Sequence, residues 1–277
     1  MHSRRLGELC PTAFVTGASG GLGQAFCEIL LDEGVCVWGT ARDPQRLQAL
    51  ASHPSFTGIT LNLDAPAEAI TAFRAAQSEA GGHFELVIQN AGYGLFGRFT
   101  QIEPERWTRQ IADMLLSTLA LSHAALAPML ARDRGSLVHV SSIAAELPIP
   151  FMAGYNVAKA GLSALSESLL AETRRTNVAV IDFRPGDYRT AFNQGMHPDG
   201  HTSDTQLARV WYRLEANLAA APTPAQAARD LRNALLRRQR GIVRSGGFFQ
   251  TRLAPVFAAF APASLVRALS ARYFNAT

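Results

Sequence analysis

The chain has 277 residues, of which 48% are hydrophobic and 17% are charged, and its formal net charge is +4. This composition supplies ample apolar material for a buried core and excludes a disordered chain. The basic residues are scattered, and the densest group is too short to form a nucleic-acid-binding surface, so we expect no nucleic-acid partner. That group consists of Arg237, Arg238, Arg240 and Arg244.

Targeting signals and metal motifs are not evident. No apolar segment follows Arg4 and Arg5, as a secretory signal would require, and the apolar stretch 253–269 is interrupted by Pro255 and Pro262. The three cysteines form no C-x-x-C pair, which is typical of a reducing compartment. We therefore expect a cytoplasmic protein. The seven histidines show no metal-ligand spacing, so we expect no metal site.

Strand-like apolar runs alternate with helix-like segments along most of the chain. Such alternation predicts parallel strands joined by right-handed crossovers, with helices on both faces of the sheet. We expect one α/β domain over 1–277, a doubly wound, Rossmann-like sheet. Strands are expected at 13–16, 35–40, 56–63, 84–89, 136–140, 178–183 and 242–244, and helices at 22–33, 44–50, 67–80, 104–131, 154–173 and 224–238.

Two segments depart from the alternation. An insertion at about 187–222, rich in Gly and Pro, follows the sixth expected strand and is well placed to cover a substrate at the carboxyl edge of the sheet. An apolar extension at about 246–277 closes the chain. The extension can cover the pocket, pack across a subunit interface, rest on a membrane surface as an amphipathic segment, or simply pack on the core.

A glycine-rich turn joins the first expected strand to the first long helix. Glycine permits a tight turn, lets bare backbone approach a pyrophosphate, and allows the helix to pack closely on the strand. The start of the helix then offers unpaired N–H groups to phosphates. The turn reads Thr16, Gly17, Ala18, Ser19, Gly20, Gly21, Leu22, Gly23, which is the spacing G-x-x-x-G-x-G.

The end of the second expected strand indicates which dinucleotide binds. An acidic residue at this point would hold the ribose hydroxyls of NAD. Here Ala41 is uncharged and Arg42 follows it. An arginine can pair with the 2′-phosphate of NADP, so we expect NADP(H) as cofactor, the alternative being that Arg42 is a solvated loop charge.

A candidate catalytic group lies between residues 142 and 159. Tyr155 and Lys159 are one helical turn apart, and Ser142 precedes the tyrosine at the end of a strand. A tyrosine can donate or accept a proton in hydride transfer if its pKa falls from about 10 towards neutrality. A nearby ammonium and an oxidised nicotinamide are the natural causes, and Ser142 can hold the substrate oxygen.

Together these motifs resemble the short-chain dehydrogenase/reductase family. The resemblance covers about 12–245 and implies a sheet of about seven strands, hydride exchange between nicotinamide and a carbonyl or alcohol, and a homodimer or homotetramer formed through the helices at 104–131 and 154–173. The matching residues are Thr16, Gly17, Gly21, Gly23, Asn90, Ala91, Gly92, Ser142, Tyr155, Lys159, Pro185, Gly186 and Thr190.

The resemblance also implies roles for the cofactor-binding residues. Asn90 would support the turn beside the adenosine ribose, and Lys159 would hold the nicotinamide ribose and begin a proton relay. The residues expected to bind the adenine are Asn62 and Leu63. Those expected around the ribose and the nicotinamide are Ala91, Gly92, Tyr155, Pro185, Gly186, Tyr188 and Thr190.

One residue departs from the family pattern. The family has an asparagine seven residues after a tryptophan in the long helix, where it bends the helix and supports a relay water. Here Met114 stands seven residues after Trp107, and a thioether cannot replace that amide. We expect a rerouted or slower relay, with a non-catalytic NADP-binding protein, or a dehydratase or epimerase variant, as alternatives.

The substrate is expected to be a rather apolar ketone or secondary alcohol. The apolar extension is similar to the tails of family members that act on steroids, retinoids or lipid-like ketones. The expected pocket includes several aromatic residues, and ordinary packing of the insertion on the sheet is the alternative explanation for them. The expected pocket residues are Tyr93, Ile143, Phe151, Phe192 and Trp211.

Overall fold

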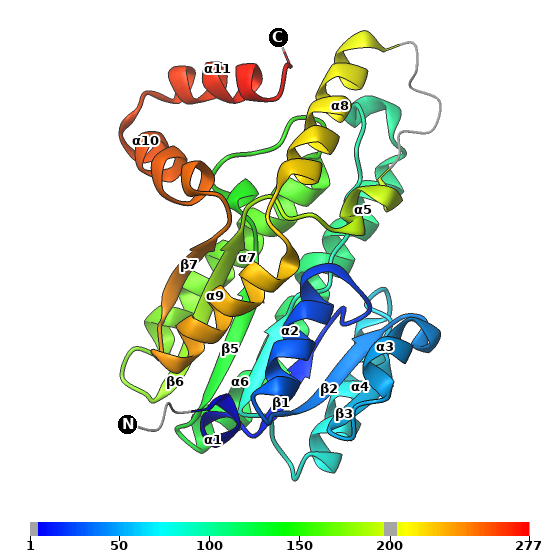
Figure 1. The fold of residues 1–277 in the computed structure, drawn as a ribbon, viewed down its shortest axis with the longest axis vertical. Helices are drawn as coiled ribbons and strands as arrows, with labels where there is room; N and C mark the ends of the chain where they lie inside the picture. Colours follow the sequence, from blue (N-terminus) through cyan, green and yellow to red (C-terminus); the bar gives the residue numbers. More distant parts are fainter. Residues whose placement is uncertain (1–4, 197–203, 277) are drawn as a thin grey trace.

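A parallel sheet of seven strands forms the centre of the molecule, which confirms the predicted doubly wound fold (Figure 1). The strand order is β3-β2-β1-β4-β5-β6-β7. The computed structural model describes residues 5–196 and 204–276. Every neighbouring pair of strands is parallel. The strands are β1 (Thr12–Val15), β2 (Cys36–Ala41), β3 (Phe56–Thr60), β4 (Leu86–Gln89), β5 (Gly135–Val140), β6 (Val178–Pro185) and β7 (Gly241–Ser245).

Helices cover both faces of this sheet. On one face, α1 (Leu6–Leu9), α2 (Gly21–Asp32), α3 (Gln48–Ala51) and α9 (Pro224–Leu236) contribute to a single apolar cluster. On the other face, residues of α4, α6 and α7 pack together against the strands. The helices that follow the strands on this second face are α4 (Pro66–Glu79), α5 (Pro104–Ile111), α6 (Ser117–Ala131) and α7 (Ala153–Glu172).

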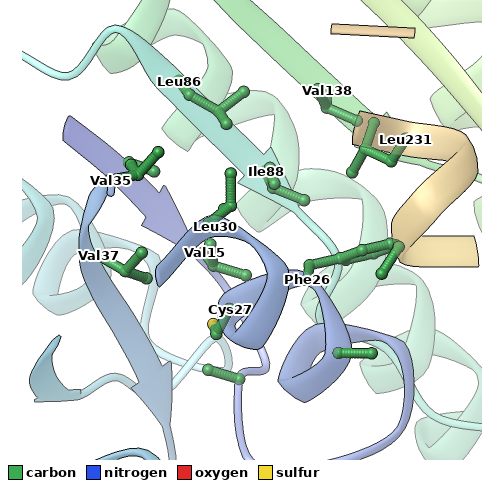
Figure 2. Close-up of a cluster of buried hydrophobic side chains, with 14 of the residues drawn as sticks. Val15, Phe26, Cys27, Leu30, Val35, Val37, Leu86, Ile88, Val138 and Leu231 are labelled. Atoms are coloured by element: carbon green, nitrogen blue, oxygen red, sulfur yellow. The ribbon is translucent and has the colours of Figure 1, made fainter. Parts of the chain in front are cut away.

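The strand β1 shows why the sheet is buried on both sides. Successive side chains of a strand point to opposite faces. Val15 therefore packs with Phe26 of α2 in one cluster (Figure 2), while Phe14 lies in the other and meets Phe73 of α4 edge-on at 4.9 Å. Each such buried side chain stabilises the fold by about 1.5–3 kcal/mol. Covering both faces explains the continuous apolar runs in the sequence.

The order of the strands reverses between β1 and β4. β2 and β3 lie on one side of β1, and β4 to β7 lie on the other. The loops leaving the carboxyl ends of β1 and β4 therefore diverge and leave a crevice between them, which is where open α/β sheets bind ligands.

The long expected helix at 104–131 is interrupted. α5 ends at Ile111, a π-helical turn spans Ala112–Leu116, and α6 begins at Ser117. By length and hydropathy this helix is the one membrane-span candidate in the described residues. Its Leu121 and Met129 are buried against the sheet, so it serves as a core helix of this fold.

The insertion after β6 and the extension after β7 rise above the carboxyl edge of the sheet (Figure 1). The expected insertion contains a short 3-10 turn and α8 (Thr205–Ala220), while residues 197–203 lie outside the described residues. After β7, the extension forms a π-helical turn (Phe249–Leu253), α10 (Ala254–Phe260) and α11 (Ala263–Tyr273). The end of the extension returns to α8, where Arg213 donates a hydrogen bond to the carbonyl of Tyr273.

Candidate active site

A cavity of about 1580 Å³ lies at the carboxyl edge of the sheet. The turn after β1 and the end of β2 form one end of it. The ends of β5 and β6 form the middle. The extension forms the remaining wall, through residues that include Leu253, Phe257, Val266 and Leu269. The cavity thus joins the expected cofactor residues, the expected catalytic residues and the apolar tail.

The glycine-rich turn presents bare backbone to this cavity. Gly17 has φ +69°, and a Cβ on it would lie 2.9 Å from the Cα of Ala91, so the position requires glycine. Gly20 lines the cavity, and a Cβ there would meet no atom within 4 Å. α2 begins at the next residue, so its free N–H groups point towards the same space. The turn therefore fits a pyrophosphate group.

Two residues of the turn that were expected to bind the cofactor do not line the cavity and support the turn from behind. Thr16 is buried, and its hydroxyl accepts hydrogen bonds from the N–H groups of Asn90 (2.9 Å) and Ala91 (3.0 Å). A Cβ on Gly23 would lie 2.0 Å from the carbonyl oxygen of Gly17, so this glycine lets α2 pack against the turn. The amide of Asn90 donates to the carbonyls of Thr16 and Gly17, which ties β4 to the turn.

Two arginines line the cavity beyond β2. Arg42 follows the strand, and Arg46 lies one turn later in a short 3-10 helix. Neither forms an ion pair within the described parts of the chain. The nearby Asp43 caps the 3-10 helix by accepting from the N–H of Gln45 at 2.9 Å. Two unpaired guanidinium groups suit a phosphate, and the sequence prediction missed the second of them.

Five residues that were expected to bind the cofactor lie near the end of β2. Asn62, Leu63, Asn90, Ala91 and Gly92 all line the cavity next to the two arginines. Tyr93 was predicted to line the substrate pocket. It lies on the cavity wall and donates a hydrogen bond of 3.0 Å to Asp113. Burial raises the pKa of the Asp113 carboxyl, and its Oδ1 has no hydrogen-bond partner.

The three expected catalytic residues converge on the middle of the cavity, where all three line the wall. Ser142 follows β5, and its hydroxyl caps a short 3-10 helix by accepting from the N–H of Ala144 at 3.0 Å. Tyr155 lies in the first turn of α7, one turn before Lys159. The hydroxyl of Ser142 acts on the phenol of Tyr155 and lowers its pKa, against the larger effect of burial. Fixed side chains of this kind can position a substrate oxygen.

Lys159 is buried with its ammonium held in place. It donates a hydrogen bond of 2.6 Å to the carbonyl of Val140, and its Nζ lies 5.6 Å from the centre of the Tyr155 ring. Burial lowers the pKa of Lys159 to about 8, while the nearby carboxylate of Asp182 acts to raise it. The ammonium form thus persists around neutral pH.

Asp182 is a buried anion that the sequence prediction missed. It lies within the fully buried strand β6, and its Oδ2 accepts hydrogen bonds from Ser163 (2.8 Å) and from Arg184 (2.7 Å). Arg184 is also paired with Glu146. A charged residue in the expected strand 178–183, which is otherwise apolar, was the available signal, because buried charges need a partner.

The expected fall in the pKa of Tyr155 is not produced by the protein's own groups. Burial raises the pKa to about 12; hydrogen bonding to Ser142 lowers it, and the charge of Asp187 raises it. A low pKa for this phenol therefore depends on positive charge brought in with an oxidised nicotinamide.

Met114 lies beside the catalytic lysine and is buried within the π-helical turn. Its Cε and the Nζ of Lys159 lie 3.1 Å and 3.6 Å from the position that a Cβ on Gly92 would take. The π-helical turn thus disturbs the helix at the point where the family's asparagine bends it, although this chain supplies a thioether there.

Two of the expected pocket residues do not line the cavity. Trp211 is buried against Phe96, with ring centroids 5.3 Å apart, and Phe151 also packs on Phe96, at 5.8 Å. These rings belong to an apolar cluster that also contains Met114 and Tyr155. Ile143 and Phe192 line the cavity as predicted, together with Leu214 and Leu218 of α8.

The cavity wall that follows β6 contains the remaining residues expected around the nicotinamide, and one pair of residues that was not expected. Pro185, Gly186, Tyr188 and Thr190 line the cavity as predicted. The side chain of Asp187 lines it too and is hydrogen-bonded to Gln250 of the extension. No local pattern marks this pair, since its members are far apart in the sequence.

Comparison with known proteins agrees with this geometry. The family model described as short chain dehydrogenase matches residues 11–200. An uncharacterised oxidoreductase of Myxococcus xanthus is 38% identical over 184 residues, which cover 63% of this chain and 71% of that protein. Two solved structures that cover most of this chain extend the likeness beyond the matched segment.

A metagenomic short-chain oxidoreductase in complex with NADP is 28% identical, with a TM-score of 0.65 over 84% of this chain and 94% of that one. A short chain dehydrogenase/reductase of Burkholderia phymatum in complex with NAD is 22% identical, with a TM-score of 0.77 over 94% and 92%. The chain is an oxidoreductase that belongs to the short-chain dehydrogenase/reductase family.

Proposed function

We propose that this protein is an NADP(H)-dependent oxidoreductase that moves a hydride between nicotinamide and a ketone or secondary alcohol on a rather apolar substrate. The observation that carries the proposal is a single cavity that joins a phosphate-binding turn, two unpaired arginines and the group Ser142, Tyr155 and Lys159.

The choice of NADP(H) over NAD(H) rests on the end of β2. Arg42 and Arg46 line the cavity there, and Ala41 supplies no carboxylate to repel a 2′-phosphate. The metagenomic relative is in complex with NADP, which supports this choice. The Burkholderia protein is in complex with NAD, so NAD(H) is the alternative cofactor.

The side chains divide the chemistry among them. When bound, the nicotinamide supplies or accepts the hydride. Ser142 orients the substrate oxygen by hydrogen bonding, and Tyr155 gives that oxygen a proton in reduction or removes one in oxidation. Lys159 holds an ammonium 5.6 Å from the centre of the Tyr155 ring, where its charge would act together with that of an oxidised nicotinamide to favour the phenolate. A positioned acid–base group of this kind contributes about 10²–10⁴ in rate.

The apolar wall indicates the class of substrate. Leu214 and Leu218 of α8 line the cavity together with apolar residues of the extension, and this surface offers little to a small polar molecule. A ketone with a large hydrocarbon body, such as a steroid, a retinoid or a secondary metabolite, fits such a wall.

We further propose two partners. A homodimer or homotetramer would bury the apolar side chains of the long helices, where Leu116, Leu119 and Val157 are half or more exposed. A membrane surface would suit the extension, whose residues 246–277 include three arginines and no acidic residue. Both partners are compatible with a protein that resides in the cytoplasm.

One observation favours a second function. The thioether of Met114 beside Lys159 cannot accept and donate protons as an amide-bound water would, so a cofactor-binding protein with slow or no turnover is the alternative. A dehydratase or epimerase variant would form product while its cofactor remains unconsumed.

The deciding experiment measures NADPH binding and NADPH consumption by the same purified protein. Binding is followed by NADPH fluorescence, and consumption by absorbance over a panel of steroid, retinoid, acyl and aromatic ketones, with NADH as the competing cofactor. We expect binding and turnover with NADPH, and a Tyr155→Phe variant that binds it without turnover. Failure to bind NADPH would overturn the proposal, and binding without consumption would favour the non-catalytic alternative.

A further inference from the structure

Asp187 places a carboxylate in the cavity immediately after Pro185 and Gly186. Across the described ranges 5–196 and 204–276, no lysine, arginine or histidine forms an ion pair with it. Its negative charge is therefore left without a protein cation at the reacting end of the cavity.

Gln250 of the extension fixes this carboxylate in place. The side-chain oxygen of Gln250 accepts the Asp187 N–H at 3.0 Å, and its Nε2 donates to Asp187 Oδ2 at 2.6 Å. The same Nε2 lies 3.3 Å from the hydroxyl oxygen of Tyr273. A Cβ on Gly186 would lie 2.4 Å from the oxygen of Gln250, so the glycine allows this approach. A neutral amide orients the carboxylate but leaves its charge uncompensated.

The field of Asp187 extends to the reacting atoms. Its charge acts on the hydroxyl of Tyr155 and raises the pKa of that phenol. Hydride transfer requires the nicotinamide ring to lie against the same substrate atom that Tyr155 and Ser142 hold. A bound ring would therefore also lie within the field of Asp187.

We infer that Asp187, held by Gln250, makes this site bind the oxidised nicotinamide more tightly than the reduced one. The oxidised ring carries a positive charge and the reduced ring is neutral, so an unpaired carboxylate stabilises only the former. When a carbonyl is reduced, its carbon takes a hydride from the nicotinamide and its oxygen takes a proton from Tyr155. The nicotinamide is then in its oxidised form. Asp187 thus favours carbonyl reduction on the enzyme and slows release of the oxidised cofactor. This inference rests on the proposed function.

The test compares the dissociation constants of NADP⁺ and NADPH in the wild type and in Asp187→Asn. NADPH is titrated by its fluorescence, and NADP⁺ by displacement of NADPH, at pH 8, because burial raises the pKa of the Asp187 carboxyl and alkaline pH favours its ionised form. Asparagine keeps an oxygen that can accept from Gln250. We expect the NADP⁺ constant to rise roughly tenfold and the NADPH constant to change less than twofold. Gln250→Ala should shift the ratio in the same direction by a smaller factor.

Asp43→Asn is the matched control, because it removes a carboxylate that lines the other end of the same cavity. It should change both dissociation constants by the same factor, and thermal melting should show that each variant is folded. An unchanged ratio in folded Asp187→Asn would overturn the inference while leaving the proposed function intact. Failure of the wild type to bind either cofactor would instead overturn the proposed function.

Discussion

The ammonium of Lys159 donates a hydrogen bond of 2.6 Å to the main-chain carbonyl of Val140, the last residue of β5. This bond ties the first turns of α7 to the strand that carries Ser142. Because the lysine is buried, its charge depends on its surroundings, and Asp182 of β6 is the group that raises its pKa. The catalytic helix is thus anchored and charged by two neighbouring strands.

Removing the charge of Asp182 should change the pH dependence of catalysis. Burial lowers the pKa of Lys159 to about 8, and Asp182→Asn removes the opposing effect, so the pKa falls further. If the ammonium form is required, the pH above which kcat/KM declines should move down by roughly one unit. The measurement is the pH profile of kcat/KM for NADPH-dependent ketone reduction.

Ser163→Ala is the control for this experiment, since it removes a hydrogen bond to Asp182 while keeping the charge. Its profile should match that of the wild type. A profile that does not move in folded Asp182→Asn would show that the lysine pKa does not limit the reaction.

Restoring an amide at position 114 should accelerate turnover. Met114→Asn places a hydrogen-bonding side chain close to the ammonium of Lys159, where it can hold a relay water. We expect kcat to rise roughly tenfold, less than a fully positioned acid–base group provides, with little change in KM. Met114→Leu keeps the apolar bulk and should leave kcat unchanged. Equal rates in all three proteins would mean that protons reach the site by another route.

The two cavity arginines should discriminate between NADPH and NADH. Arg42→Ala and Arg46→Ala each remove a charge-assisted contact to the expected 2′-phosphate, which is worth about 1.5–3 kcal/mol, or roughly 10- to 100-fold in affinity. NADPH binding should weaken by this factor and NADH binding should not. Arg237→Ala changes an exposed arginine that does not line the cavity and serves as control. Equal weakening of both cofactors would contradict the assignment of the phosphate.

Buried His139 should make folding stability depend on pH. Burial lowers its pKa to about 4, whereas an exposed histidine titrates near 6.5. Between these values the unfolded chain binds a proton that the folded protein does not. Stability is therefore lost as pH falls from 6.5 towards 4, by up to roughly 3 kcal/mol.

Urea unfolding at several pH values in this interval measures the effect. His139→Gln keeps polar atoms near Ser122 and Ser166, the two hydroxyl partners of the ring, but cannot titrate. Its stability should decline less steeply than that of the wild type. Parallel declines would assign the acid sensitivity to other groups.

The extension should bind anionic lipid vesicles. Phe248 and Phe260 are 71% and 88% exposed and do not line the cavity, so Phe248→Ser combined with Phe260→Ser removes apolar surface without touching the pocket. Sedimentation with vesicles of phosphatidylcholine and phosphatidylglycerol should fall several-fold in this variant, with NADPH oxidation unchanged.

Leu130→Ser, an exposed leucine on α6, is the matched control for vesicle binding and should behave as the wild type. Equal sedimentation of wild type and the phenylalanine variant would remove the membrane as a partner. A change in oligomeric state, measured by light scattering, would assign the phenylalanines to a subunit interface.

Sequence reasoning succeeded where function depends on short motifs at strand ends. The turn after β1, Arg42 after β2 and Ser142 after β5 are placed by the parallel order of the strands, because the carboxyl ends of such strands share one edge. Tyr155 and Lys159 follow from one helical turn of spacing. These features need only local structure and the direction of the chain.

Other features depend on tertiary packing and could not be predicted. The direction of an aromatic side chain is set by its neighbours, so Trp211 and Phe151 were wrongly expected in the pocket, although they pack on Phe96 behind its wall. The pairing of Asp187 with Gln250 joins residues that no periodicity connects. Asp182 carried a readable signal, a charge within a buried strand, but its partners emerged only from the fold.

The extension and the rest of the molecule are two parts that can change separately during evolution. The residues that we propose to bind cofactor and transfer protons lie between positions 17 and 190, inside the segment that matches the family, whereas residues 249–274 build much of the apolar wall. Substitutions or exchanges in the tail can therefore alter the range of substrates without rebuilding the sheet. The hydrogen bonds of Gln250 to Asp187 set a limit on that freedom, because a tail that lost them would also disturb the charge beside the reaction.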